Sequence, residues 1–355
     1  MRRSNGLSST RCKEVIDSEE TYTSAARAAL PHYGFGTGAS LTLLSLSENG
    51  TYLVEERGRR AIIRVHRSGY HDRAAIESEL SWMERVSADC GVSTPQLIPA
   101  LDGQRVVTVF DGGHPRHVDA VSVIDGHTGE DAGCEVRLAE LGRISAQLHR
   151  HAEQWHPPTG FTRFRWDFAH NLGAAARWGD WRNGPGVRRD DHALLERAVV
   201  VLADALDAYG MAPDRFGLIH ADLRMSNIMV SPGGEITVID FDDCGYGWLM
   251  SDLSSVVSWH EHDEEKTHRA VSDWLSGYLP HRALSEDDLS MIPAFVMMRR
   301  LMLTAWLGTH PDSPPARAVG TSYAQGTVEL AGRFLTDPTW LRFSSRDLTP
   351  SALTA

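Results

Sequence analysis

The residues best suited to chemistry lie in one segment, 216–243, which reads FGLIHADLRMSNIMVSPGGEITVIDFDD. It carries a histidine, an asparagine and several carboxylates around two short apolar runs, Ile228–Val230 and Thr237–Ile239. Short apolar runs separated by proline and glycine predict two strands, joined here by Ser-Pro-Gly-Gly-Glu-Ile. The polar side chains at the open end of this hairpin are therefore the candidates for a reactive site.

The predicted hairpin brings two oxygen-bearing side chains together. We expect the strands to pair antiparallel with Val230 opposite Thr237, and in that register Asn227 lies opposite Asp240. Neighbouring strands are roughly 5 Å apart, so both side chains can reach one hard cation. Mg²⁺ takes a few protein oxygens and completes its shell with water and phosphate. The pattern therefore predicts that Asn227 and Asp240 hold Mg²⁺.

A third carboxylate is available for a different task. Asp222 precedes Asn227 by five residues, on a loop that must curl over the same end of the hairpin. Its carboxylate can accept the proton of an attacking hydroxyl, a role worth typically about 10²–10⁴-fold in rate. Phosphoryl transfer uses the same three roles: one carboxylate acts as the base, and an asparagine and an aspartate bind the metal.

The elements that must position these residues differ between the two parts of the chain. Before Asp125-Gly126 we expect strands at 41–47, 51–55, 61–66, 97–100, 105–110 and 117–124, and one helix at 72–86. Beyond it we expect helices at 136–151, 193–209, 249–259, 264–278, 293–307 and 318–334, while residues 155–188 show no periodic pattern. This order predicts an α+β protein with an antiparallel sheet first and helices after it.

Composition narrows the possible partners. The 355-residue chain has 35 Lys and Arg against 47 Asp and Glu, a formal net charge of −12. Nucleic-acid binding depends on clustered basic side chains, so no nucleic-acid partner is expected. No apolar run approaches the roughly 20 residues of a membrane span, and the first residues lack the apolar stretch of a signal peptide. These features predict a cytoplasmic protein without a membrane partner.

The segment from His220 to Asn227, followed by Asp240-Phe241-Asp242, resembles the catalytic loop and metal-binding motif of the aminoglycoside phosphotransferase and choline kinase superfamily. The likeness runs from about Leu41 to about Phe334 and is greatest to the branch of homoserine kinase type II, hydroxylysine kinase and the stress-response kinase. It implies a bilobal protein-kinase-like fold. We expect an N-terminal extension at 1–30, a β-rich lobe with one prominent helix at 31–123, a hinge at 124–130, a helical lobe at 131–340 and a mobile tail at 341–355.

The resemblance also implies a nucleotide site. The loop between the first two strands would cover the phosphates, with Ser47, Asn49, Gly50, Thr51 and Tyr52, and the adenine would lie near Val123, Ile124 and Asp125. The lysine of the family's third strand is replaced by Arg64, which can still fork onto phosphates. Glu79 lies nearer than Glu77 to the apolar stripe of its helix, so we expect Glu79 to pair with Arg64.

The acceptor site is less marked in the sequence. Candidates for substrate contacts are Asp242, Asp243, Tyr246, Trp248, Arg299 and Trp306. His220 is expected to be structural and to hold the loop by hydrogen bonding. Asp252, at the start of a predicted helix, is open to two interpretations, an N-cap or loop brace and a substrate contact. The resemblance implies the brace, because in that family the aspartate of such an Asp-Leu pair braces the catalytic loop.

Together these features predict an ATP-dependent kinase, with GTP as the alternative nucleotide, that uses Mg²⁺. It would phosphorylate a hydroxyl of a small molecule such as an amino acid, an amino-alcohol, an aminoglycoside or another antibiotic, as a monomer or homodimer. Three other functions remain open. They are a protein Ser/Thr kinase of the stress-response type, a nucleotide-binding pseudokinase that lacks the lysine, and a metal phosphohydrolase using Asp222, Asp240, Asp242 and Asp243.

Overall fold

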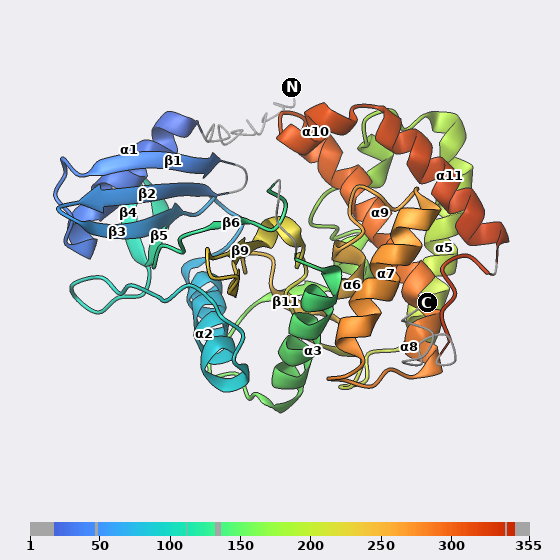
Figure 1. Ribbon diagram of the computed structural model, residues 1–355. Coiled ribbons are helices and arrows are strands. Elements are labelled where there is room, and N and C mark those ends of the chain that lie inside the picture. Colours follow the sequence, from blue (N-terminus) through green and yellow to red (C-terminus); the bar gives the residue numbers. More distant parts are fainter. Residues whose placement is uncertain (1–17, 47–48, 112, 132–135, 338, 345–355) are drawn as a thin grey trace, which may run out of the picture. The chain divides into compact units, whose positions relative to one another are not determined.

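The computed structural model describes residues 18–46, 49–111, 113–131, 136–337 and 339–344. Contacts divide the chain into two compact units, one of residues 1–73 and 98–122 and the other of residues 74–97 and 123–355. The first is built on one antiparallel sheet, and the second is mainly helical (Figure 1).

The sheet of the first unit has the strand order β1-β2-β3-β5-β4, with antiparallel neighbours throughout. Its strands are β1 (Ser40–Leu46), β2 (Gly50–Glu56), β3 (Arg59–Val65), β4 (Val107–Asp111) and β5 (His114–Val121). Arg57 and Gly58 have φ of 50° and 78°, as a two-residue turn between twisted strands requires. The expected meander is confirmed, whereas 97–100 forms no strand of this sheet.

A helix that precedes the sheet completes the core of the first unit. Helix α1 (Glu19–Ala29) starts at Ser18, whose side chain accepts a hydrogen bond from Thr21 N, and a 3₁₀ turn, η1 (Leu30–Tyr33), follows it. The helix packs against β2, β3, β4 and β5 (Figure 1). Its buried residues are Tyr22, Ala25, Ala26 and Ala29. Part of the expected N-terminal extension is thus built into the core.

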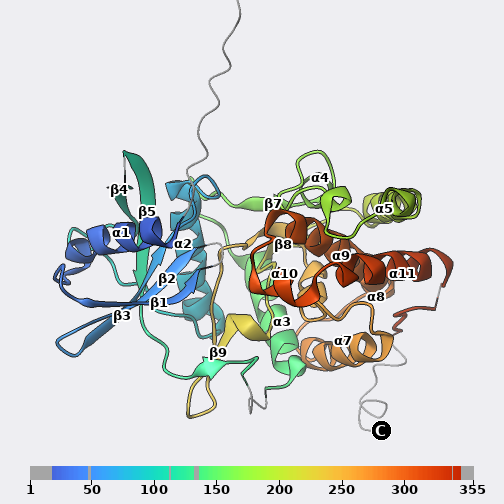
Figure 2. The same ribbon diagram turned by 90° about the horizontal axis from the view of Figure 1, so that it is seen from above.

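The second unit contains α2 (Arg73–Cys90), α3 (Leu138–Gln154), α4 (Phe168–Asn171), α5 (His192–Tyr209), α6 (Ser251–Ser255), α7 (Glu264–Tyr278), α8 (Glu286–Ser290), α9 (Ile292–Thr309), α10 (Pro314–Val319) and α11 (Ser322–Thr336). Helix α9 is buried on nearly every side, contacts α5, α6, α8 and α11, and lies in the middle of the helical part (Figure 2). The helix expected at 318–334 is interrupted, because Gly320 has φ of 53° between α10 and α11.

Helix α2 packs within this second unit, although the sequence suggested the β-rich lobe. Trp82 lies edge-on to Phe241, with ring centroids 5.6 Å apart, and its indole Nε1 donates to His151 Nδ1 at 3.3 Å. Ser78 Oγ accepts from Thr162 N at 3.0 Å. These contacts attach α2 to the segments that surround the candidate site.

Two small sheets position that site. One has the order β10-β9-β6, from β6 (His127–Thr128), β9 (Ile228–Val230) and β10 (Ile236–Val238). The other has the order β7-β11-β8, from β7 (Phe164–Trp166), β8 (Phe216–Ile219) and β11 (Gly245–Trp248). Three of these short strands, β8, β9 and β10, lie within residues 216–243, and β11 follows them. The reactive segment is therefore a series of very short strands joined by polar loops.

Candidate active site

The reactive segment forms the expected hairpin, but its register differs by one residue. Val230 lies opposite Ile236, so the predicted pairing of Val230 with Thr237 is wrong. Beyond the strands, Ile239 N donates to Asn227 O at 3.0 Å. Asn227 therefore faces Ile239 and not Asp240, the partner that the sequence had predicted.

The turn explains the shift. Ser231 N donates to Glu235 O and Gly234 N donates to Ser231 O, both at 2.9 Å, which closes the turn over residues 231–235. Ser231 Oγ accepts two further backbone N–H groups, from Gly233 at 3.3 Å and Glu235 at 3.1 Å. Gly234 has φ of 83°, which costs glycine little. Because the turn closes within these residues, Ile236 joins the strand.

Asp240 follows the hairpin in a left-handed conformation, with φ of 60°. This conformation is uncommon outside glycine and redirects the chain directly after Ile239. The pKa of Arg224 is raised mainly by Asp222, with a further contribution from Asp240, so both carboxylates act on one guanidinium. The charges of Asp222, Glu130 and Asp240 therefore all favour the charged form of Arg224.

Asp222 is held from three directions. Its Oδ2 accepts from Arg224 Nε at 3.0 Å and from Asn227 Nδ2 at 2.9 Å, and its Oδ1 accepts from Arg299 Nη2. Burial by itself would raise its pKa, but Arg224 and Arg299 lower the pKa of Asp222 below its ordinary value. The carboxylate is therefore ionised at neutral pH and fixed in one orientation.

The backbone beside Asp222 is clamped in an unusual shape. Ala221 has φ of 67°. Its N–H donates to Asp252 Oδ1 at 2.8 Å, while its carbonyl accepts from Arg299 Nη1 at 3.1 Å and Ser255 Oγ at 3.2 Å. Left-handed backbone costs a non-glycine residue about 1–2 kcal/mol. These hydrogen bonds from α6 and α9 offset that cost.

Asp252 braces the loop, as the family resemblance implied. Its Oδ2 accepts the backbone N–H of His220 at 3.2 Å and lies 3.1 Å from His149 Nε2, while His149 Nδ1 lies 2.8 Å from Tyr278 Oη. His220 is fully buried, with Nε2 3.2 Å from Ile239 O. The structural interpretation of His220 is confirmed, and of the two interpretations of Asp252 the hydrogen bonds and its full burial favour the loop brace.

The chemistry of the donor set fits a magnesium ion. The amide nitrogen of Asn227 donates to Asp222 O at 2.8 Å and to its carboxylate, and the amide oxygen lies 3.5 Å from Ser226 Oγ. That oxygen and the carboxylate of Asp240 are the ligand types Mg²⁺ prefers. In the described residues no cluster of three or more His, Cys, Asp or Glu side chains could hold a metal. A site with two protein ligands needs phosphate oxygens and water to complete it.

A buried arginine holds the segment after Asp240. Arg163 Nε donates to Cys244 O at 2.7 Å, Nη1 donates to Ala75 O at 3.0 Å, and Nη2 donates to Asp242 O. Its Nη1 also lies 3.7 Å from Glu79 Oε2. Arg163 therefore ties residues 242–244 to α2. Glu79 pairs with this arginine inside the second unit, and its expected pairing with Arg64 stays a prediction.

The first unit carries the residues predicted to meet the nucleotide phosphates. Arg64 lies directly across from Asp119 and donates to its Oδ2 at 3.1 Å, while His66 Nε2 lies 2.6 Å from the same oxygen. Asn49 Oδ1 accepts from Arg67 N at 3.0 Å, which fixes the start of β2 against the end of β3. Ser47 lies outside the described residues.

The remaining nucleotide candidates differ in exposure. Tyr52 is 1% exposed, with its hydroxyl 3.0 Å from Thr23 Oγ1, so its side chain is a core group and only its backbone can meet a phosphate. Gly50 packs so closely on Tyr22 that an added Cβ would lie 2.8 Å from that ring. Thr51 and two of the predicted adenine residues, Val123 and Ile124, are half-buried, whereas the third, Asp125, is exposed.

The candidates for acceptor contacts differ in how far they are buried. Trp248 is wrong as a substrate contact, because it is 1% exposed and its indole N–H donates to Gly210 O at 2.9 Å. Asp242 is also buried, whereas Asp243, Tyr246 and Trp306 are half-buried. Arg299 is buried against the predicted base itself.

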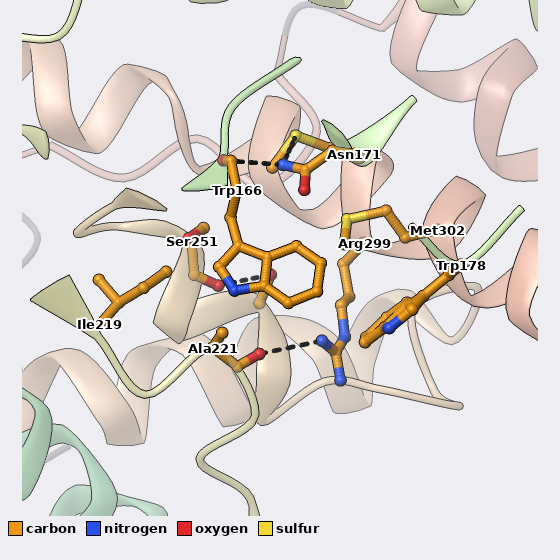
Figure 3. A pocket seen from close by; sticks show the side chains of 10 residues that line it. Trp166, Asn171, Trp178, Ile219, Ala221, Ser251, Arg299 and Met302 are labelled. Carbon is orange, nitrogen blue, oxygen red and sulfur yellow. Dashed lines mark hydrogen bonds between the residues drawn. The ribbon is translucent and has the colours of Figure 1, made fainter. Parts of the chain in front are cut away.

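A small pocket adjoins the catalytic loop (Figure 3). It is lined by residues of β7, α4, β8, α6 and α9 and of the loops beside them: Trp166, Asn171, Trp178, Ile219, Ala221, Ser251, Ser254, Met298, Arg299 and Met302. The irregular connection 155–188 therefore supplies Trp166, Asn171 and Trp178 to the surroundings of Asp222.

Sequence reasoning missed two arginines at this site. Arg224 stands two residues after Asp222, so its charge beside the predicted base was visible in the motif itself. Arg163 lies in the segment without a periodic pattern, 81 residues before Cys244, whose carbonyl it binds. Nothing in the local sequence indicated that second contact.

Residues 41–286 match the model of the phosphotransferase enzyme family, and the chain belongs to that family. It is 44% identical to a microcompartment-associated aminopropanol kinase of known structure, with a TM-score of 0.80 over 89% of this chain and 98% of that one. It is 24% identical over 302 residues to the amicoumacin kinase of Bacillus subtilis, which covers 82% of this chain and 85% of the relative.

The fold is shared with an amicoumacin kinase solved with AMP-PNP and Ca²⁺, at 22% identity and a TM-score of 0.69, over 87% of this chain and 92% of that one. The chain is therefore a kinase with a protein-kinase-like fold, an ATP-dependent phosphotransferase that acts on small molecules. Among its described residues, no helix combines the length and apolar character needed to cross a membrane.

Proposed function

We propose that this protein phosphorylates the hydroxyl of a small amino-alcohol, using MgATP. The observation that carries the proposal is the 44% identity to the aminopropanol kinase along almost the whole of both chains. The geometry around Asp222 supports it, because an ionised, oriented carboxylate is what a hydroxyl acceptor requires.

The reaction follows from the groups at the site. The acceptor oxygen attacks the γ-phosphorus, the bond from that phosphorus to the β-phosphate oxygen breaks, and ADP leaves. The hydroxyl proton passes to Asp222, which hydrogen-bonds the acceptor before transfer. Asn227 and Asp240 would hold Mg²⁺, which neutralises charge on the phosphates. Arg64 would contact the phosphates in place of the family's usual lysine.

The acceptor is tested by a panel with ATP and Mg²⁺, measuring ADP and the phosphorylated product by mass spectrometry. The panel contains 1-amino-2-propanol, ethanolamine, choline, homoserine, hydroxylysine and an aminoglycoside. We expect the highest kcat/KM for a small amino-alcohol. A higher kcat/KM for homoserine or the aminoglycoside would contradict the proposed acceptor, but the protein would still be a small-molecule kinase. Labelling of a protein, or nucleotide-induced thermal stabilisation without any product, would favour the protein kinase or pseudokinase alternatives.

Asp222→Asn tests the proposed base with a side chain of the same shape. We expect kcat to fall by about 10²-fold or more, because the amide cannot accept the proton. Asp207→Asn, on the exposed face of α5, is the control and should keep full turnover. Wild-type turnover in a folded Asp222→Asn variant would contradict the assignment.

A further inference from the structure

Arg299 reaches the catalytic loop from the centre of the helical unit. It lies on α9, is 4% exposed, and directs its guanidinium at three groups. Nε donates to Ser258 Oγ at 3.1 Å, Nη1 donates to Ala221 O at 3.1 Å, and Nη2 donates to Asp222 Oδ1. The guanidinium of Arg299 thus hydrogen-bonds both Ala221, which has the left-handed backbone, and the carboxylate of Asp222, the next residue.

The orientation of the guanidinium is itself restrained. Its central carbon lies 5.0 Å from the centroid of the Trp178 ring, and Figure 3 shows the indole beside the group while Nη1 meets Ala221 O. Trp178 comes from the irregular connection 155–188 and is 7% exposed. An arginine stacked on an aromatic face has few other orientations, so its fork is preset for the loop.

The charge of Arg299 is balanced by Asp222. A buried guanidinium requires a paired anion, and removing one member of such a pair is strongly destabilising. Arg300, the next residue, uses a separate partner: its Nη1 lies 2.9 Å from Glu261 Oε2, and its Nε donates to Thr327 Oγ1 at 2.9 Å. Two adjacent buried arginines therefore face in different directions, one toward the base and one toward α11.

We infer that Arg299 is a positioning residue for phosphoryl transfer and not a contact of the acceptor. It holds Oδ1 of Asp222 and the carbonyl of Ala221 together, so that the whole carboxylate keeps one orientation toward the acceptor hydroxyl. The inference rests on the proposed role of Asp222 as the base. The inference also assigns a role to the connection 155–188, because its Trp178 holds the guanidinium of Arg299 in place.

The test compares matched substitutions at the two arginines, Arg299→Lys and Arg299→Met against Arg300→Lys and Arg300→Met. Steady-state kinetics use the acceptor on which the wild type is most active. We expect kcat to fall about tenfold in Arg299→Lys and about 10²-fold in Arg299→Met, with the KM for ATP changed less than about threefold, because misplacing a reacting group by about 1 Å costs that much. Arg300→Lys should lower Tm and keep kcat within about threefold.

A second measurement does not depend on turnover. In a thermal double-mutant cycle, Asp222→Asn and Arg299→Met should each lower Tm, and the double variant should lower it less than the sum of the single shifts, by at least about 2 °C. Additive shifts would overturn the inference, as would a folded Arg299→Met variant with wild-type kcat or an equal loss of kcat in Arg300→Met. If no amino-alcohol is phosphorylated, the proposed acceptor is wrong. The double-mutant cycle still shows whether Arg299 and Asp222 interact, because it does not depend on turnover.

Discussion

Asp222 and Asp119 show how individual residues keep buried acids ionised in this protein. Each carboxylate would have its pKa raised by burial, and each has its pKa lowered overall because arginine lies beside it. Arg224 and Arg299 act on Asp222, and Arg64 acts on Asp119 together with His66. A buried carboxylate paired with arginine therefore occurs twice, at Asp222, the predicted base, and at Asp119, beside the predicted phosphate-binding Arg64.

The role of Asp119 can be measured through the pH dependence of stability. Because its pKa is lower in the folded than in the unfolded chain, its stabilising contribution is complete above the ordinary aspartate pKa of about 4 and is lost as the pH falls below that. Asp119→Asn should therefore lower the free energy of unfolding at pH 7, by about 3 kcal/mol, since it breaks a buried ion pair. Urea unfolding of both proteins between pH 3 and pH 7 gives the difference.

The wild type should approach the Asp119→Asn variant as the pH falls, because protonated aspartic acid resembles the amide. Asp207→Asn, at an exposed position of α5, should match the wild type at every pH. A constant difference between wild type and Asp119→Asn down to pH 3 would mean that folding does not lower the pKa of Asp119, and would contradict this account of the ion pair.

At the scale of elements, local patterns predicted which segments form strands and helices. Helix α7 has the bounds expected from sequence, 264–278, because Asp263 caps it by accepting a hydrogen bond from Lys266 N and its apolar residues recur at helical spacing. The hairpin strands were also found, but their register was not. Register depends on how the turn closes, and the bonds to Ser231 Oγ and the positive φ of Gly234 are not visible as periodicity.

The turn that sets this register can be tested with two neighbouring glycines. Gly234 has φ of 83° and open space where a Cβ would lie, so Gly234→Ala adds backbone strain without a clash. We expect it to lower the free energy of unfolding by about 1–2 kcal/mol. At Gly233 an added Cβ would lie 3.6 Å from Ser231 Oγ, an ordinary contact, so Gly233→Ala should change stability by less than about 1 kcal/mol. Equal effects of the two substitutions, measured by urea unfolding, would refute this account of the turn.

At the scale of the whole molecule, the family and its reactive segment were predictable, because they rest on one contiguous motif. The contacts that hold the motif in place were not. Arg299 and Arg163 bind backbone carbonyls of Ala221 and Cys244, 78 and 81 residues away in sequence. An arginine in an apolar segment indicates a buried partner but does not say which one, because the partner is set by the packing of α2, α9 and the connection 155–188.

The extent of the first unit is a further property of the whole molecule, and a matched pair of substitutions tests it. Ala26 of α1 is 0% exposed and belongs to the core of the sheet unit, whereas Ala28 of the same helix is exposed. Ala26→Asp should lower the free energy of unfolding by more than about 3 kcal/mol, because it buries an unpaired charge. Ala28→Asp keeps its charge in water and should cost less than about 1 kcal/mol. Urea unfolding and limited proteolysis of the two variants compare them directly. Similar stability of both would mean that α1 is an appendage and that the unit begins after it, as the sequence alone suggested.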